Sequence, residues 1–116
     1  MKNIKRGDIY FANLDPTIGK EIKKTRPVLI ISNDINNSYS DLVTVVPLTS
    51  QTENIYPYEV LISKEESGLV KNSKIKCNQI RTIDKIRLIK KTGAIISEKF
   101  NPIEQAICIH LDIKLM

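Results

Sequence analysis

Short apolar runs separated by polar, turn-rich segments make up most of the chain, and helical spacing appears only near its C-terminal end. Runs rich in Val, Ile and aromatic residues, bounded by turn-forming residues, are typical of β-strands. They predict strands over residues 8–12, 26–32, 43–49 and 58–62, and a shorter apolar run covers 92–96.

Three of these segments carry further detail. The run 26–32 (RPVLIIS) is continuously apolar after its proline, which indicates a strand covered on both faces, as in the middle of a small barrel. The run 43–49 contains Pro47, so we expect an edge or a bulge there rather than an unbroken central ladder. Between residues 73 and 83, the chain alternates between two sets of positions, one with Ile75, Cys77 and Gln79 and the other with Lys74, Lys76 and Asn78. The phase of this alternation shifts at Ile80-Arg81.

The remaining segments read as loops and one helix. Residues 15–25 are turn-rich and then charged, and residues 33–41 are predicted to form a second loop. Asn101 followed by Pro102 predicts a helix start, with Asn101 as N-cap. Its expected packing face consists of Ile103, Ala106, Ile107, His110 and Leu111. Many short strands ending in one helix predict a single, mainly β domain over residues 1–116, built as a small barrel.

Composition narrows the choice of partner only slightly. The net charge is +5 and the isoelectric point about 9.3, which admits an anionic partner. Fourteen of the eighteen basic residues are Lys, however, and Lys codons are A/T-rich, so genome composition explains part of this charge. No run approaches the ~20 apolar residues needed to cross a bilayer, so we expect a cytoplasmic protein without membrane contact.

Most enzyme signatures are absent from the sequence. Cys77 and Cys108 have no CxxC partner, and no glycine-rich phosphate-binding motif occurs. His110 is the only histidine, and its place on the packed face of a helix favours a structural role. The acidic residues are scattered through loops, so we expect neither a metal nor another cofactor.

A set of polar residues remains at the predicted strand ends, comprising Arg26, Thr49, Ser50, Gln51, Gln79, Arg81 and Thr82. Arg26 opens a strongly apolar strand and is fixed by Pro27, which would aim its planar fork of donors at a phosphate. The alternative is that Arg26 only caps a strand end and pairs with Glu21 or another acid. The residues alone leave both interpretations open.

Five segments together resemble the MazF/PemK toxin family, namely 6–10 (RGDIY), 15–19 (DPTIG), 25–34 (TRPVLIISND), 46–51 (VPLTSQ) and 79–85 (QIRTIDK). They follow the family's order and spacing from Arg6 to the last helix. No single segment is specific, but RPVLIIS followed by PLTSQ and QIRTIDK is specific in combination.

The resemblance implies a small SH3-like barrel of the CcdB/MazF type with a C-terminal helix, working as a homodimer. It implies an endoribonuclease that cuts single-stranded RNA, often mRNA, at a short sequence, with Arg26 and Thr49 as catalytic residues. The expected RNA contacts are Thr17, Lys20, Lys23, Lys24, Thr25, Ser50, Gln51, Asn78, Gln79 and Arg81. The implied partner is a cognate, MazE-like antitoxin with an acidic, disordered C-terminal segment, which would block the RNA groove and bind DNA together with the toxin.

The chemistry suits these residue types. RNA carries its own nucleophile, the 2′-hydroxyl, beside the scissile phosphate, so no metal-bound hydroxide is needed. The enzyme must stabilise charge on a five-coordinate phosphorus, which Arg26 and the Thr49 hydroxyl would do. Arginine is a poor general base because it stays protonated. Either Arg26 is strongly perturbed, or water or a neighbouring group takes the proton.

Two positions depart from the family pattern. Many relatives carry paired glycines where this chain has Lys23-Lys24, so the loop should be less flexible and more attractive to phosphate. An acidic residue often precedes the QIR segment, whereas Asn78 stands here. If that position touches bases, the preferred cut sequence would change.

Two other functions compete with a nuclease. A CcdB-like gyrase poison would share the fold, but that group typically uses a tryptophan on its C-terminal helix and this chain has none. A non-enzymatic barrel that binds RNA or peptide would also fit the composition. It is disfavoured because Arg26 and Thr49 both occur in their expected contexts.

Overall fold

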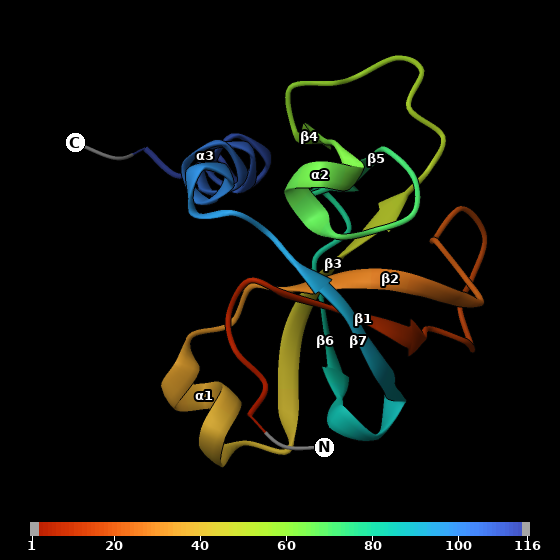
Figure 1. Ribbon diagram of the computed structural model, residues 1–116, viewed down its shortest axis with the longest axis vertical. Coiled ribbons are helices and arrows are strands. Elements are labelled where there is room, and N and C mark those ends of the chain that lie inside the picture. Colours follow the sequence, from red (N-terminus) through yellow and green to blue (C-terminus); the bar gives the residue numbers. More distant parts are fainter. Residues whose placement is uncertain (1–2, 115–116) are drawn as a thin grey trace.

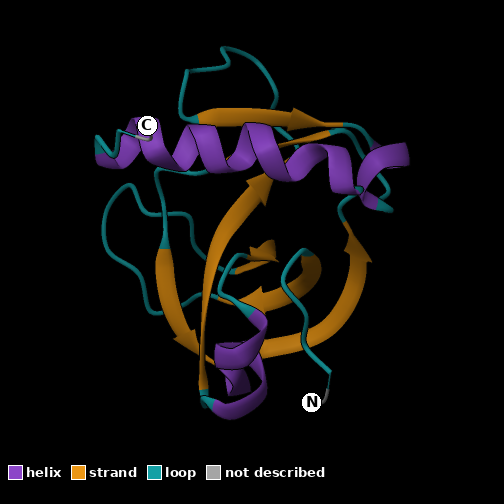
Figure 2. Ribbon diagram, turned by 90° about the vertical axis from the view of Figure 1, so that its left-hand side faces the viewer, coloured by secondary structure: helices purple, strands orange, loops and turns teal. Residues whose placement is uncertain are grey.

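Seven antiparallel strands form the centre of the computed structural model, which describes residues 3–114 (Figure 1). The strands are β1 (Asp8–Asn13), β2 (Thr25–Ile30), β3 (Leu42–Thr49), β4 (Glu59–Ile62), β5 (Ser73–Lys76), β6 (Arg81–Asp84) and β7 (Leu88–Ala94). The helices are α1 (Asp34–Tyr39), α2 (Lys64–Ser67) and α3 (Phe100–Leu111), with 3₁₀ turns η1 (Lys85–Arg87) and η2 (Ser97–Lys99). Figure 2 shows strands curving beneath α3, which lies across one end of the molecule.

Strand β3 joins the two parts of this sheet. The strand order is β4-β5-β3-β2-β1-β7, and β6 also pairs with β3. Along one edge, β3 pairs with β6 up to Val45 and with β5 from Leu48 onwards. Pro47 lies in the gap between these partners, where a missing backbone N–H costs no ladder hydrogen bond on that edge. The expected interruption of the ladder at Pro47 is therefore confirmed.

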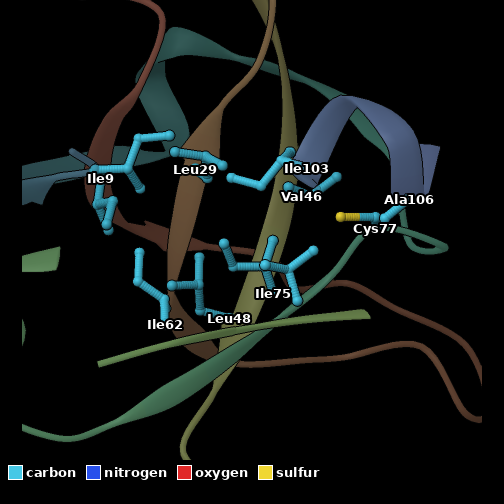
Figure 3. Close-up of a cluster of buried hydrophobic side chains, with 11 residues drawn as sticks. Ile9, Leu29, Val46, Leu48, Ile62, Ile75, Cys77, Ile103 and Ala106 are labelled. Carbon is cyan, nitrogen blue, oxygen red and sulfur yellow. The ribbon is translucent and has the colours of Figure 1, made fainter. Parts of the chain in front are cut away.

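Strand β2 is covered on both faces, as its continuous apolar run predicts. Leu29 packs in a cluster with Ile103 of α3 and the buried residues of β3, β4 and β5 (Figure 3). Val28 and Ile30 face a second cluster formed by β1, β3, β6 and β7. Side chains alternate across a strand, so one strand contributes to two cores. The expected mainly β architecture with a C-terminal helix is confirmed.

The phase shift expected near Ile80 marks the break between two strands. The segment 73–83 divides into β5 and β6, with a turn at residues 77–78 between them. Both strands pair with β3, one after the other. The seventh strand, β7, covers Leu88–Ala94 and contains only part of the short apolar run 92–96. Polar Lys90 and Lys91 belong to the strand because they pair with β1.

Two short helices stand where loops were expected. In the predicted loop 33–41, the Asn33 side chain accepts a hydrogen bond from Asn36 N at 2.8 Å and caps α1. Helix α2 begins at a capping box made by Ser63 and Glu66 and ends at Gly68, whose φ is 78°. Cap residues stabilise these two helices. The helix interiors are too short and too polar to show apolar periodicity in the sequence.

The last helix begins earlier than its proline indicates. Lys99, not Asn101, is the N-cap, and α3 continues directly from η2. Pro102 is accommodated because the first-turn N–H groups of a helix have no partner within the helix. Of the expected packing face, Ile103 and Ala106 are buried, whereas His110 and Leu111 are exposed. No described helix is long and apolar enough to span a bilayer.

Candidate active site

Arg26 and Thr49 lie at adjoining ends of β2 and β3. Val28 pairs with Pro47 and Leu29 with Val46 in the antiparallel ladder. Arg26 lies two residues before Val28 and Thr49 two residues after Pro47, so both stand just beyond this end of the ladder. Both residues are partly buried, and both line the same two clefts. The fold therefore brings together the two residues for which the sequence predicts catalytic roles.

The Arg26 guanidinium has no acidic partner among residues 3–114. Its Nε donates a hydrogen bond to the Lys23 carbonyl at 3.2 Å. The Glu21 carboxylate, the partner expected for a purely structural arginine, instead accepts a hydrogen bond from Ile18 N at 2.7 Å. The two terminal nitrogens of Arg26 thus retain their donors for an anion.

The Thr49 hydroxyl is also free to donate. Its Oγ1 accepts a hydrogen bond from Gln51 N at 3.2 Å, which fixes the oxygen at the start of the β3–β4 connection. An accepted bond uses a lone pair and leaves the hydroxyl proton available. The site therefore presents a cation and a neutral donor side by side, a combination that stabilises a phosphate gaining negative charge.

Two clefts meet at Arg26 and Thr49. The first, here called the apolar cleft, has a volume of about 510 Å³ and includes Phe11, Pro27, Leu48, Leu69 and Val70 in its walls. Its basic residues besides Arg26 are Lys71, Lys90 and Lys91. The second, here called the basic cleft, has a volume of about 390 Å³. Its lining comprises Lys20, Ile22, Arg26, Thr49, Gln51, Glu53, Asn54, Tyr56, Lys74, Lys76 and Gln79.

A third cleft, of about 290 Å³, lies beneath the β1–β2 loop (residues 14–24). Its walls include the predicted site residues Gln79 and Arg81. Gln79 Oε1 accepts a hydrogen bond from Ile22 N at 2.9 Å, and Arg81 Nη1 donates one to the Leu14 carbonyl at 3.0 Å. Asn78 lines the same cleft, and its buried Oδ1 has no hydrogen-bond partner among residues 3–114. These contacts hold the loop against the sheet.

The predicted RNA-binding residues thus fall into three groups, one of which, Asn78 and Arg81, lines the third cleft. Lys20, Ser50, Gln51 and Gln79 line the clefts beside Arg26 and Thr49. Thr17, Lys23, Lys24 and Thr25 belong to the loop or its end and line neither of these two clefts. Thr82, the remaining polar candidate, lines neither of these clefts, and its hydroxyl lies 2.9 Å from the Thr44 hydroxyl.

Sequence reasoning missed a buried ion cluster beside the basic cleft. Glu59 accepts hydrogen bonds from Lys74 and Lys76, each at 3.0 Å. Burial alone would raise the pKa of Glu59, but the hydrogen bonds from Lys76 and Lys74 outweigh it and lower the pKa below its ordinary value. The glutamate therefore stays ionised. The lysine alternation in 73–83 was a usable signal, but it indicated only a solvent-facing side.

Other kinds of chemistry find little support in the described residues. No three His, Cys, Asp or Glu side chains of residues 3–114 stand together as metal ligands. Both cysteines are free, and burial together with the Glu59 charge raises the pKa of the Cys77 thiol to about 12. A neutral buried thiol is a weak nucleophile.

Comparison with known proteins identifies the fold and the family. An endoribonuclease from a mycobacterial species, solved in complex with its cognate antitoxin, has a similar fold, with a TM-score of 0.82 at 24% identity over 98% of this chain and 100% of that one. Endoribonuclease EndoA of Bacillus subtilis is 40% identical over 93% of this chain and 94% of its own length. Endoribonuclease MazF9 of Mycobacterium tuberculosis is 34% identical over 95% of this chain and 98% of its own length.

The fold is thus that of a small antiparallel β protein closed by a C-terminal helix. Residues 5–111 match the family described as PemK-like, MazF-like toxin of type II toxin-antitoxin system. The chain belongs to this family.

Proposed function

We propose that the chain is a metal-independent endoribonuclease toxin that cleaves single-stranded RNA, above all mRNA, at a short recognition sequence. The observation that carries the proposal is that Arg26 and Thr49 both line each of the two lysine-lined clefts. The relatives named endoribonucleases, which align over nearly the whole chain, support it. An mRNA substrate would place the protein in the cytoplasm.

The reaction would be an internal transesterification. The 2′-oxygen attacks phosphorus and forms a new P–O bond, while the bond from phosphorus to the 5′-oxygen breaks. The products are a 2′,3′-cyclic phosphate and a 5′-hydroxyl, whose oxygen takes up one proton. Arg26 would bind two non-bridging oxygens and Thr49 would donate one further hydrogen bond as negative charge develops.

The proton from the 2′-hydroxyl goes to water in this scheme. Of the acidic residues, only Glu53 lines either cleft, and it is exposed. Alignment of the 2′-oxygen and stabilisation of charge therefore account for the catalysis, since an intramolecular nucleophile already has a high effective concentration.

RNA would enter along both clefts and displace the β1–β2 loop. The loop is held by Gln79 and Arg81, and its Lys23 carbonyl accepts the Arg26 Nε–H. Opening it would release all three side chains for RNA. The proposed RNA contacts are Thr17, Lys20, Lys23, Lys24, Thr25, Ser50, Gln51, Asn78, Gln79 and Arg81.

The proposed partners follow from the family and the charge. A cognate antitoxin with an acidic segment would compete for the lysine-lined clefts, and folding on binding is how such segments usually act. The working unit would be a homodimer.

The test is cleavage of a long single-stranded RNA in EDTA, with the cut ends mapped. The wild type should give discrete cuts with 5′-hydroxyl ends. Arg26→Ala and Thr49→Val should each lower kcat by about 10²–10³-fold, because each removes a donor to the transition state. Thr49→Ser, which keeps the hydroxyl, should retain most of the activity.

Thr82→Ala is the matched control, because Thr82 bonds to Thr44 and lines neither cleft. A folded wild type that leaves RNA whole would refute the proposal. Equal activity of Thr49→Val and wild type would remove Thr49 from the mechanism.

A further inference from the structure

Two lysines of β5 share one buried carboxylate beside the basic cleft. Lys74 Nζ lies 3.0 Å from Glu59 Oε1, and Lys76 Nζ lies 3.0 Å from Glu59 Oε2. The Glu59 side chain is 0% exposed and that of Lys74 8%, so these charges are held away from water. Buried charges persist only when they are paired and hydrogen-bonded. Two positive charges and one negative charge leave this fixed cluster with one excess positive charge.

The two lysines differ in how many donors they have left. Besides Glu59, Lys74 Nζ donates to the Glu53 carbonyl at 3.3 Å and the Asn54 carbonyl at 3.4 Å. A lysine has three donors, so Lys74 is saturated and holds the β3–β4 connection in place. Lys76 makes its side-chain hydrogen bond to Glu59 and, within residues 3–114, to no other group. Two of its N–H donors are therefore available.

The spare donors face the same side of the sheet as the catalytic pair. Lys74 is the ladder partner of Thr49, so the two side chains share a face, and Lys76 follows on that face two residues later. Lys76 is 21% exposed at its side chain and lines the basic cleft with Lys20 and Arg26. Glu53 is the acidic residue in that lining.

We propose that Lys76 binds an RNA phosphate next to the one that is cleaved, and that Glu59 and Lys74 are positioning residues that fix its ammonium group. This inference rests on the proposed function. A strand whose scissile phosphate lies at Arg26 and Thr49 continues through the basic cleft, and every nucleotide adds a phosphate. Free lysine side chains lose conformational entropy when they are ordered. Glu59 has already ordered Lys76, so the phosphate meets a prepared donor.

The test is RNA binding measured as a function of salt. The probe is a fluorescein-labelled, single-stranded 2′-O-methyl RNA, which has no free 2′-hydroxyl and stays intact. Each phosphate contact contributes about −0.7 to the slope of log affinity against log salt. Lys76→Gln should make this slope shallower by about 0.7 and weaken binding roughly fivefold near 0.1 M salt. In cleavage assays the same change should raise KM and leave kcat nearly unaltered, because this phosphate is remote from the reacting atoms.

Lys64→Gln is the matched control, because the substitution removes the same charge at a different place. Lys64 is exposed and lines none of the three clefts. It should leave the slope at the wild-type value, and Lys76→Arg should restore it. Lys76→Met removes the charge but keeps an unbranched apolar side chain, which gives a second folded variant. All variants retain the Lys74–Glu59 pair, and thermal unfolding checks their folding.

A folded Lys76→Gln or Lys76→Met protein with the wild-type slope would overturn the inference, as would an equal loss in Lys64→Gln. Cleavage of unmodified RNA of the same sequence judges the proposed function separately. A wild type that binds the probe through Lys76 without cleaving RNA would contradict the nuclease and leave the phosphate site standing.

Discussion

Lys24 has a backbone conformation that favours glycine. Its φ is 69°, in the left-handed region, and its carbonyl accepts the Leu14 N–H at 3.0 Å where the β1–β2 loop closes. A side chain in this region costs about 1 kcal/mol, which glycine avoids. We expect Lys24→Gly to raise the free energy of unfolding by about 0.5–1 kcal/mol, as measured by urea denaturation.

The neighbouring lysine provides the control for this prediction. Lys23 is not among the described residues with positive φ, so Lys23→Gly should lower the free energy of unfolding through added chain entropy. An equal gain from both substitutions would show that lost charge repulsion, not relief of backbone strain, stabilises the protein.

At this scale the sequence predicted the catalytic candidates but not their surroundings. Arg26 and Thr49 were found through their motifs, and the strand register brings them together. Lys74 stood in the sequence only as one member of an alternating pattern, and it is 7% exposed. Strand alternation gives a residue's side of the sheet, but it does not reveal which acid from another strand faces that side. Glu59 lies on β4 and becomes the partner only through strand pairing.

Between elements, β7 and α2 make an unusually close approach. A Cβ atom added at Gly93 would stand 2.1 Å from the Ser67 carbonyl oxygen, a backbone atom that cannot rotate away. We expect Gly93→Ala to push α2 off β7 and to lower the free energy of unfolding by about 1–3 kcal/mol. Because Gly68 and Thr92 line the apolar cleft, RNA cleavage should fall as well.

Gly19→Ala provides a comparison in open space. No atom lies within 4 Å of its added Cβ, although its φ of 60° is unfavourable for alanine. It should cost about 1 kcal/mol, through the backbone alone. Thermal or urea unfolding of both variants measures the difference. A Gly93→Ala protein as stable as Gly19→Ala would mean that α2 tolerates displacement.

The Glu59 cluster couples β4 to β5 and should make stability depend on acidity. Hydrogen bonds from Lys76 and Lys74 overcome the effect of burial and hold the pKa of Glu59 below its ordinary value. A depressed folded pKa stabilises the folded state above the unfolded pKa, about 4.3, and this stability is lost as pH falls through the folded value. We therefore expect the wild type to be less stable at pH 3 than at pH 7.

Glu59→Gln isolates the contribution of this carboxylate. It leaves two lysines without their counter-charge and should cost about 3 kcal/mol at pH 7. The difference from wild type in urea unfolding should shrink below about pH 4, where the wild-type carboxyl also becomes neutral. A difference that stays constant from pH 7 to pH 3 would mean that shape, rather than charge, holds β4 against β5.

Elements were predictable where apolar periodicity was strong. The strands over β1, β2, β3 and β4 appear within about two residues of their expected positions, because their buried faces dictate the pattern. The helices α1 and α2 were missed because only their caps identify them. The start of α3 was placed two residues late, since Pro102 is tolerated throughout the first turn and does not mark its first position.

Across the whole molecule, the positive charge is concentrated where Arg26 and Thr49 lie. Seven of the eighteen basic residues line the apolar or the basic cleft, and Glu53 is their only acidic lining residue. Composition alone left open whether the net charge of +5 reflects function or codon usage. Its clustering favours function, because charge without a role would be spread over the surface.

The end of α3 leaves apolar side chains exposed on the isolated chain. Ile109 is 58% exposed, Leu111 50% and Ile113 49%, and Leu61 on the adjacent strand β4 is 49% exposed. Large apolar side chains left exposed on a helix and on the strand packed beside it are typical of an interface. We expect a homodimer through this face, so light scattering should give about twice the chain mass of 13.2 kDa.

Ile109→Lys should shift this dimer toward monomers, because an isologous interface would bring the two new charges together or bury them. Ile35→Lys is the control, since Ile35 is 77% exposed on α1, outside this face. It should keep the wild-type mass. If Ile109→Lys remains a dimer, the interface lies elsewhere on the sheet. If the Ile109→Lys monomer still cleaves RNA at the wild-type rate, one protomer holds the complete active site and the second serves stability or antitoxin binding.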